Sequence, residues 1–376
     1  MALGAELVYD FGMKRHTLAK HRILRLYLEH WFPILNSRGD GLAYIDGFAG
    51  QGTYDGGEPG SPIIALQTAN AYSGKSGFYA HFWFIESDPT HAESLRGEVS
   101  RIELRDGIRV EGILESKFEE GFPAIIGRLR DEFGMPPTFA LVDPSGFSGV
   151  KMKTLATFLH MPRCELMFTL MDGFLTRFSA LPEDARKKTL NDLFGTDEWE
   201  GAKDHSGSRK TKFLLDLYVK QLKAHGVRYI QTFEMCNKHD QTVYHLVFAT
   251  NKNLGIEKMK EAMVKVDPGF TFRTSDALDH NQSYFFSYAG EEWYEQAAKL
   301  ILRQFSGKTV TRRKIKWFVI LETPYLYKEG ILDVMTRHGQ IVNESPRTGS
   351  GRKTGLDRTV TFEKSNPVQT RLFPHD

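Results

Sequence analysis

The stretch that decides the fold is Leu42-Ala-Tyr-Ile-Asp46-Gly-Phe-Ala-Gly50-Gln-Gly52. Its first five residues predict a short buried strand, and three glycines follow that strand directly. Residues 62–71 then predict a helix, so the glycine loop joins a strand to a helix. In this context glycines let the backbone approach a ligand closely, because no Cβ stands in the way. The stretch therefore predicts a ligand-binding loop in an α/β domain.

The strand and helix pattern repeats after this loop. Apolar runs at residues 81–86, 108–114 and 139–143 predict further strands, and helical patterns follow at 89–102, 118–133 and 151–159. Strands that alternate with helices favour a parallel, doubly wound, Rossmann-like sheet covered on both faces.

The flanking segments complete the first predicted domain, residues 1–290. Mixed three- and four-residue spacings predict an amphipathic N-terminal helix at 17–35 that ends near Pro33. A strand at 165–171 precedes a helical insertion at about 173–226, which the polar loop 205–212 interrupts. Strands at 227–235 and 243–250 then predict an antiparallel hairpin. A sheet that ends in such a hairpin is typical of class I methyltransferases rather than of NAD-binding domains.

Residues 291–376 predict a second, α+β domain. Helices are expected at 291–305, 309–322 and 327–338, followed by strands at 340–342 and 358–362. A basic, glycine-rich loop at 345–355 joins these two strands. Three short helices followed by such a hairpin resemble a winged helix.

The amino-acid composition and net charge indicate a globular protein and exclude several other classes. Hydrophobic residues at 41% and charged residues at 26% are ordinary for a globular protein, and the net charge of +2 gives no global attraction to nucleic acid or membrane. Cys164 and Cys236 lie in apolar runs, so we expect neither a disulfide framework nor a cysteine-based zinc site. The first residues lack a secretory pattern and no apolar run is long enough to span a membrane, so a cytoplasmic protein is expected.

The glycine loop favours S-adenosylmethionine as the cofactor. A nicotinamide fingerprint needs G-x-G-x-x-G with an acid about 20 residues later, whereas here the spacing is G-x-x-G-x-G and the next strand-end acid is Glu86. Glu86 is the candidate for the ribose hydroxyls, and Glu115 for the adenine amino group. A simple turn between strand and helix is the alternative. The candidate cofactor residues in the loop are Asp46, Gly47, Phe48, Ala49, Gly50 and Gly52.

Asp143-Pro144-Ser145-Gly146-Phe147 follows the fourth strand and is the candidate catalytic segment. Amino-group methyltransferases often carry Asp/Asn-Pro-Pro-Tyr/Phe at this place, where the acid or amide accepts hydrogen bonds from the target amine. We therefore expect Asp143, Pro144 and Phe147 to act in methyl transfer, which needs alignment of the reactants and no metal. A strand-end turn is the alternative.

The C-terminal segment is locally basic. Residues 308–353 contain ten Lys or Arg residues against four Asp or Glu residues. This excess predicts phosphate contacts that position a nucleic acid without reading its sequence. A domain for dimerisation or for a protein partner is the alternative. The candidate nucleic-acid contacts are Arg312, Arg313, Lys314, Arg347, Arg352 and Lys353.

Several short matches run through nearly the whole chain. They include His16-Thr17 with Lys20, the strand and loop 44–52, Gly60-Ser61-Pro62, Asp143-Pro144, and Glu322-Thr-Pro-Tyr325. On these residues the chain resembles the three-Cys-motif partner (TcmP) family. The resemblance implies a Rossmann-type methyltransferase fold and a partner protein that carries three cysteines. Family members commonly have Phe after the Asp-Pro, where this chain has Ser145.

Three functions remain open at this point. The preferred interpretation is an S-adenosylmethionine-dependent methyltransferase that acts on nucleic acid, at a base nitrogen. The second is a non-catalytic, methyltransferase-like adaptor for nucleic acid or protein. The third is a methyltransferase for a protein or a small molecule. Salt-sensitive binding to DNA or RNA would count against the third.

Overall fold

A computed structural model describes residues 14–36, 41–72, 77–146, 148–175, 183–276, 292–345 and 355–364. The chain divides into two compact units. The first comprises Met1–Asp267 and Phe272–Asp279, and the second comprises Pro268–Thr271 and His280–Asp376.

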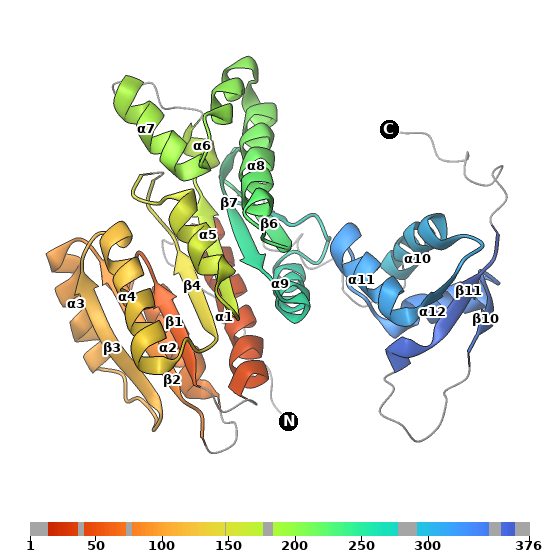
Figure 1. Cartoon of the computed structure of the whole chain (residues 1–376), viewed down its shortest axis with the longest axis horizontal. Coiled ribbons are helices and arrows are strands. Elements are labelled where there is room, and N and C mark those ends of the chain that lie inside the picture. Colours follow the sequence, from red (N-terminus) through yellow and green to blue (C-terminus); the bar gives the residue numbers. More distant parts are fainter. Residues whose placement is uncertain are drawn as a thin grey trace. The chain divides into compact units, whose positions relative to one another are not determined.

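The first unit is built on a mostly parallel sheet. Among its described residues eight strands pair in the order β3-β2-β1-β4-β5-β7-β6-β8 (Figure 1). The strands are β1 (Leu42–Asp46), β2 (Ala80–Glu86), β3 (Ile108–Glu115), β4 (Thr138–Val142), β5 (Cys164–Leu170), β6 (Tyr229–Cys236), β7 (Thr242–Thr250) and β8 (Arg273–Ser275). β7 runs antiparallel to its neighbours β5 and β6, which confirms the predicted hairpin at this end of the sheet.

The strand order places the ligand-binding edge of this sheet. The chain passes outward from β1 through β2 to β3 and then returns to β4 on the other side of β1. In open α/β sheets ligands bind outside the carboxyl ends of the strands at such a reversal of strand order. Asp46 closes β1 and Asp143 follows β4, so the reversal brings these two acids to neighbouring strand ends.

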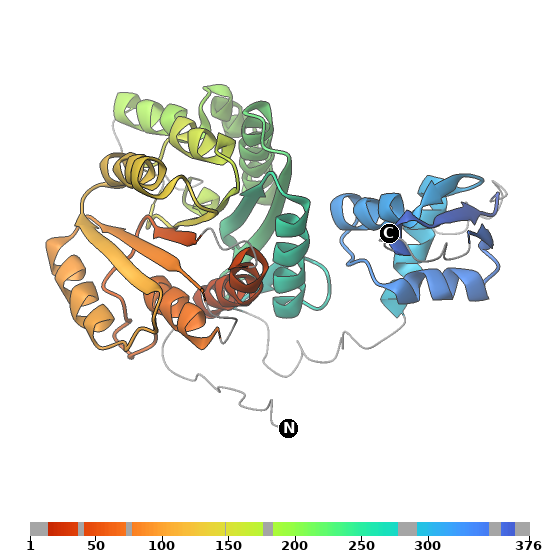
Figure 2. The ribbon, with the colours of Figure 1, turned by 60° about the horizontal axis from the view of Figure 1, so that its bottom comes forward.

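Helices cover both faces of the sheet. Figure 2 shows α1 and α9 on one side and α4 and α5 on the other. The helices are α1 (Arg15–Asn36), α2 (Ser61–Ala71), α3 (Pro89–Ser100), α4 (Phe118–Phe133), α5 (Met152–His160), α6 (Asp172–Leu175), α7 (Glu183–Phe194), the short 3₁₀ helix η1 (Glu198–Asp204), α8 (Gly207–Ala224) and α9 (Asn253–Val266). The doubly wound architecture expected from the alternating pattern is thus confirmed.

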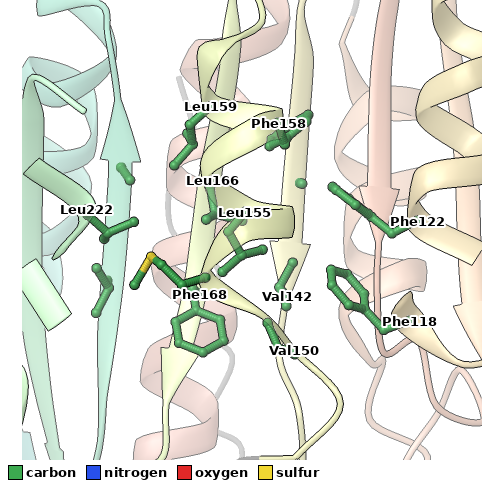
Figure 3. Packing of buried hydrophobic residues seen from close by; sticks show 14 of the residues in the cluster. Phe118, Phe122, Val142, Val150, Leu155, Phe158, Leu159, Leu166, Phe168 and Leu222 are labelled. Atoms are coloured by element: carbon green, nitrogen blue, oxygen red, sulfur yellow. The ribbon is translucent and has the colours of Figure 1, made fainter. Parts of the chain in front are cut away.

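An extensive apolar core lies between the sheet and the helices α4, α5 and α8. Strand residues that point to this face alternate with those that point to α1, as the period of two requires. Figure 3 shows Phe118 and Phe122 of α4, Val142 of β4 and Phe168 of β5 packed in this layer. Leu222 of α8 belongs to the same cluster, so α8 is an integral part of the core.

A buried carboxylate fastens α1 to the opposite face. Glu165 of β5 accepts hydrogen bonds from the Tyr27 hydroxyl (2.6 Å) and the Trp31 indole N–H (2.9 Å), both on α1. It also accepts one from the Thr250 hydroxyl of β7 (2.8 Å). A buried carboxylate that lacks hydrogen-bond donors lowers the free energy of unfolding. Any shift of α1 along the sheet would break these bonds, so they fix its position.

Two local expectations for the first unit were wrong, and two elements were not expected at all. α1 continues through Pro33 to Asn36, because the proline removes one hydrogen bond while Trp31 and Phe32 keep their buried contacts. The polar loop predicted at 205–212 ends at Ser206, and its remaining residues form the first turns of α8. α9 and β8 were not anticipated.

The second unit combines helices with a small antiparallel sheet. Its described elements are α10 (Glu292–Phe305), β9 (Thr309–Thr311), α11 (Arg312–Glu322), α12 (Glu329–Arg337), β10 (Ile341–Glu344), the 3₁₀ turn η2 (Gly355–Asp357) and β11 (Thr359–Phe362). The three strands pair in the order β10-β11-β9. The helix predicted over 309–322 therefore starts late. Thr309–Thr311 pairs with β11, and the Thr311 hydroxyl accepts the Lys314 N–H to cap α11.

The Glu165 contacts generate a stability prediction. Tyr27→Phe keeps the ring and removes one donor to a buried carboxylate, so the free energy of unfolding should fall by about 1–2 kcal/mol. Urea unfolding followed by circular dichroism measures this. Arg25→Ala is the matched control, because Arg25 lies on the exposed side of the same helix, where it pairs with the exposed Glu29 (3.1 Å). An equal loss in both variants would contradict the role given to Glu165.

Candidate cofactor and active site

The glycine loop lies over the carboxyl end of β1. Gly47 packs against α4 so closely that a Cβ there would lie 2.7 Å from the Phe118 ring. Gly50 has a φ of +64°, in the left-handed region that favours glycine, and the space where its Cβ would stand is open. The Phe48 ring stacks on Phe118 at 5.4 Å, and the Ala49 N–H donates to the Ile85 carbonyl (2.9 Å). The loop thus presents backbone to an open space.

Glu86 connects this loop to the end of β2. Its Oε2 accepts the Gly50 N–H (2.9 Å) and its Oε1 accepts the Asp88 N–H (2.8 Å). The two bonds hold the carboxylate beside the loop. Each of its oxygens can still accept one more hydrogen bond. The side chain is partly exposed, so a ligand lying on the loop can reach it.

Asp46 lies beneath the loop and is fully buried. Its Oδ1 accepts the Phe48 N–H (3.2 Å), whereas its Oδ2 has no hydrogen-bond partner among the described residues. Burial raises the pKa of Asp46 to about 7, although the Ser61 hydroxyl and the Phe48 N–H favour the carboxylate. A positively charged ligand on the loop would offset the cost of ionising this group.

Asp143, at the end of β4, forms a buried ion pair with Lys20 of α1. The Lys20 side chain is 9% exposed and that of Asp143 is 21% exposed. Burial by itself would raise the pKa of Asp143, but the Lys20 ammonium holds it below its usual value. Asp143 is therefore a carboxylate at neutral pH, with one edge open to solvent. The pattern of residues gave no signal for this pair, whose members are separated by 123 positions.

Aromatic rings surround the ion pair. The Lys20 ammonium lies 5.8 Å from the centre of the Tyr244 ring on β7. Tyr54, which is 40% exposed on the loop after β1, has its ring 5.7 Å from that of His21. Burial and the neighbouring Lys20 ammonium lower the pKa of His21 to about 3, so this ring is neutral near pH 7. Sequence patterns did not identify Lys20, Tyr54 or Tyr244 as site residues.

Four other residues were predicted to belong to the site at this edge, namely Pro144, Phe147, Glu115 and Gly52. Pro144 is buried next to Asp143, and Phe147 lies outside the described residues. Glu115 ends β3 but turns to Arg96 of α3, with which it forms an exposed ion pair (2.6 Å). Gly52 contributes to the loop chiefly through its carbonyl, which accepts the Gly60 N–H (2.7 Å) at the start of α2.

The predicted cations of the second unit have different surroundings. Arg312 forms ion pairs with Glu329 and Glu344 and is largely buried, so its charge is used within the unit. Arg313 is exposed and pairs with Asp357 (2.8 Å), and Lys314 is exposed beside it on α11. Arg347, Arg352 and Lys353 lie outside the described residues.

Two further polar pairs lie at the carboxyl edge. His16 is buried, and its Nδ1 pairs with Asp276 after β8 (2.9 Å). Asp172, the first residue of α6, lies 2.6 Å from the Nδ1 of His245 on β7. Only the folded topology brings these residues together, because each pair joins distant parts of the chain.

The described part of the chain contains neither a metal-ligand cluster nor a membrane-spanning helix. No three His, Cys, Asp or Glu side chains gather there as a metal site. Within the same residues no helix is long and apolar enough to cross a bilayer.

The chain matches no protein-family model and no curated protein sequence. Its structure is similar to protein LPL1258 from Legionella pneumophila, with a TM-score of 0.41, 10% identity, and 66% of this chain and 91% of that chain covered. It is also similar to the methyltransferase domain of METTL16, with a TM-score of 0.33, 17% identity, and 61% and 68% covered. Trm1 from Pyrococcus horikoshii, solved with S-adenosyl-L-methionine, gives a TM-score of 0.35 and 15% identity over 70% of this chain and 62% of that one. These similarities are too weak to carry a function.

The Lys20 and Asp143 pair generates a second prediction. In the wild-type protein the pKa of Asp143 is lower in the folded state than in the unfolded chain. The resulting stability is fully present above the unfolded pKa. It is lost as the pH falls through the lower, folded pKa. In Lys20→Met the ammonium no longer offsets burial, which then raises that pKa, so stability is instead lost as the pH rises toward the raised value. At about pH 8 the free energy of unfolding should fall by about 3–5 kcal/mol, and at about pH 5 by clearly less.

Urea unfolding of both proteins at the two pH values measures this difference. The double variant Lys20→Met/Asp143→Asn serves as the control, because it has no carboxylate to titrate and should lose the extra pH dependence. If Lys20→Met loses the same stability at both pH values, Asp143 does not depend on Lys20 for its charge.

Proposed function

We propose that this chain is an S-adenosylmethionine-dependent methyltransferase that acts on nucleic acid. The observation that carries the proposal is the arrangement at the reversal of strand order. There the glycine loop after β1, the Glu86 carboxylate after β2 and the Asp143 carboxylate after β4 share one edge of the sheet. This edge is where α/β sheets bind ligands.

The residues of the loop fit a cofactor that carries positive charge. The open space over Gly50 admits a ligand against the backbone, and the buried Oδ2 of Asp46 lacks a hydrogen-bond partner among the described residues. A cationic group would favour the carboxylate form of Asp46, whose pKa burial has raised. Glu86 would accept hydrogen bonds from the ribose hydroxyls, in line with its place at the end of the second strand. S-adenosylmethionine, with its sulfonium, ammonium and ribose, has the matching groups.

The same cofactor would supply a methyl group on a sulfonium, and the protein needs chiefly to align the acceptor. Asp143 would accept a hydrogen bond from the target amine and so hold its lone pair toward the methyl group. Lys20 keeps Asp143 ionised for this role. The exposed ring of Tyr54 lies near the pair and offers a surface for a nucleobase, a role that Ser145 cannot take.

Nucleic acid as the substrate is supported by the second unit. Its order of elements, α10, β9, α11, α12, β10 and β11, is that of a winged helix, and we propose this fold for it. Arg313 and Lys314 on α11 are exposed and could contact phosphates. Arg312 is excluded from our proposed contact surface because Glu329 and Glu344 neutralise it. The three-cysteine partner implied by the family resemblance stays a prediction.

Calorimetric titration of the full chain with S-adenosylmethionine, and separately with NAD, tests the proposed cofactor. We expect micromolar binding of the first and no measurable binding of the second. Glu86→Gln should weaken binding about tenfold, because a neutral amide replaces charge-assisted bonds to the loop and the ribose. Glu103→Gln, an exposed change in the loop before β3 at the opposite edge of the sheet, should have no effect. Equal binding by Glu86→Gln and the wild-type protein would remove Glu86 from the site, and no binding at all would favour the adaptor interpretation.

Cofactor binding should also depend on pH through Asp46. Below a pH of about 7 Asp46 is largely protonated, and a cationic cofactor must displace that proton to bind. Affinity should therefore rise as the pH increases toward about 7, by at most about tenfold per pH unit, and level off at higher pH. The same titrations on Asp46→Asn should give weaker binding. The pH dependence that remains in this variant should come only from the cofactor's own titratable groups. A wild-type affinity that is flat or falls over this range would contradict the role of Asp46.

A further inference from the structure

A second feature opens at the carboxyl edge of the first unit. It is a cavity of about 590 Å³ between the start of α1, the turn that joins β6 to β7, and the residues that follow β5 and β8. None of the predicted cofactor residues lines it. The lining residues are Lys14, Arg15, His16, Gly173, Asn237, Lys238, His239, Thr242, Val243 and Asp276.

The charges around this cavity are mainly positive. Lys14 and Lys238 are exposed and Arg15 is partly exposed, so three cationic side chains from two separate segments face one space. Asp276 is the carboxylate among the lining residues, and both of its oxygens are engaged. Its Oδ1 accepts the His16 N–H (3.0 Å) and its Oδ2 pairs with the His16 ring (2.9 Å). An anion in the cavity would therefore meet cations whose charge this carboxylate only partly offsets.

The cavity is coupled to the candidate reaction centre through α1. His16, which lines it, and Lys20, which binds Asp143, are four residues apart, or about 6 Å along the helix axis. Tyr244 of β7 contacts both. Its ring lies 5.6 Å from the His16 ring and 5.8 Å from the Lys20 ammonium, and its hydroxyl donates to the His16 carbonyl (3.1 Å). One helix and one strand therefore fix the distance between the cavity and Asp143.

We propose that this cavity binds a backbone phosphate of the polynucleotide, next to the nucleotide that receives the methyl group. The proposal rests on the proposed function, because it assigns a subsite for the substrate of that reaction. Phosphate contacts set the register of a nucleic acid without reading its sequence. A phosphate held about one helical turn from Lys20 would place the adjoining base toward Asp143 and Tyr54. The cations of the first unit would then contribute to substrate binding alongside those of the second.

Binding of a fluorescein-labelled, mixed-sequence single-stranded RNA, and of DNA of the same sequence, tests this by fluorescence anisotropy at several salt concentrations. The test variant is the full chain with Lys14→Gln, Arg15→Gln and Lys238→Gln. We expect its affinity to fall about tenfold, and the slope of log affinity against log salt to become shallower by about 0.7, the value for one lost phosphate contact on a single strand. The matched control removes three exposed cations away from the cavity, with Lys203→Gln, Lys223→Gln and Arg228→Gln, and should keep both values. Calorimetry with S-adenosylmethionine on each variant checks that the cofactor site is intact.

The outcomes separate this proposal from the function on which it rests. An equal loss in the test and control variants, or no loss in the test variant, would overturn the phosphate subsite while nucleic-acid binding stands. A wild-type chain that binds S-adenosylmethionine but neither oligonucleotide would overturn the subsite and the nucleic-acid substrate, and would leave the cofactor assignment. A chain that binds oligonucleotide through the three cations but not S-adenosylmethionine would support the subsite and refute the methyltransferase.

Discussion

The buried ion pair between Lys20 and Asp143 sets the geometry of the whole carboxyl edge. Removing two charges from water is costly, and the cost is recovered only when the partners meet closely in a fixed arrangement. Here the ammonium comes from the first helix of the chain and the carboxylate from the fourth strand, so the pair requires that α1 lie across the sheet at the reversal of strand order. The candidate acceptor site and the basic cavity both lie along α1, so their separation depends on this arrangement.

α1 is held at both ends by buried polar contacts. At one end Tyr27 and Trp31 bind Glu165, and at the other His16 binds Asp276. Between them Lys20 reaches Asp143. Each contact pairs a residue of this helix with an acid on or directly after a strand, so the helix has little freedom to slide. A rigid α1 would keep the cationic cavity and the candidate reaction centre at a constant separation, as the proposed binding of a polynucleotide needs.

Much of the fold could be predicted from local patterns. The strand Leu42–Asp46 and the helix Phe118–Phe133 were predicted at their observed bounds, because buried parallel strands and amphipathic helices leave clear periodicities. The hairpin of β6 and β7 followed from two apolar runs and a polar turn. β9 was mistaken for part of a helix, since a three-residue strand has no periodicity of its own and depends on pairing with β11. Glycine spacing and strand-end acids also led to Asp46, Glu86 and Asp143.

What the patterns could not provide was the set of long-range partners. Lys20 reads as an ordinary polar residue of an amphipathic helix until the fold places it on Asp143. Arg312 counts toward a basic surface until Glu329 and Glu344 are found beside it. The cavity joins the start of α1 to a hairpin turn more than 200 positions away, and neither segment is unusual by itself. Local composition predicts how much charge a segment carries, but tertiary contacts decide which charges remain available.

The central claim is that this edge of the sheet moves a methyl group to nucleic acid. It is tested most directly by incubating the full chain with S-adenosylmethionine labelled in its methyl group and with mixed RNA and DNA, followed by digestion to nucleosides and mass spectrometry. We predict label on a base nitrogen, and its loss in Asp143→Ala with cofactor binding retained. A chain that binds the cofactor yet leaves every nucleoside unlabelled, or an Asp143→Ala variant that transfers label as well as the wild-type protein, would contradict it.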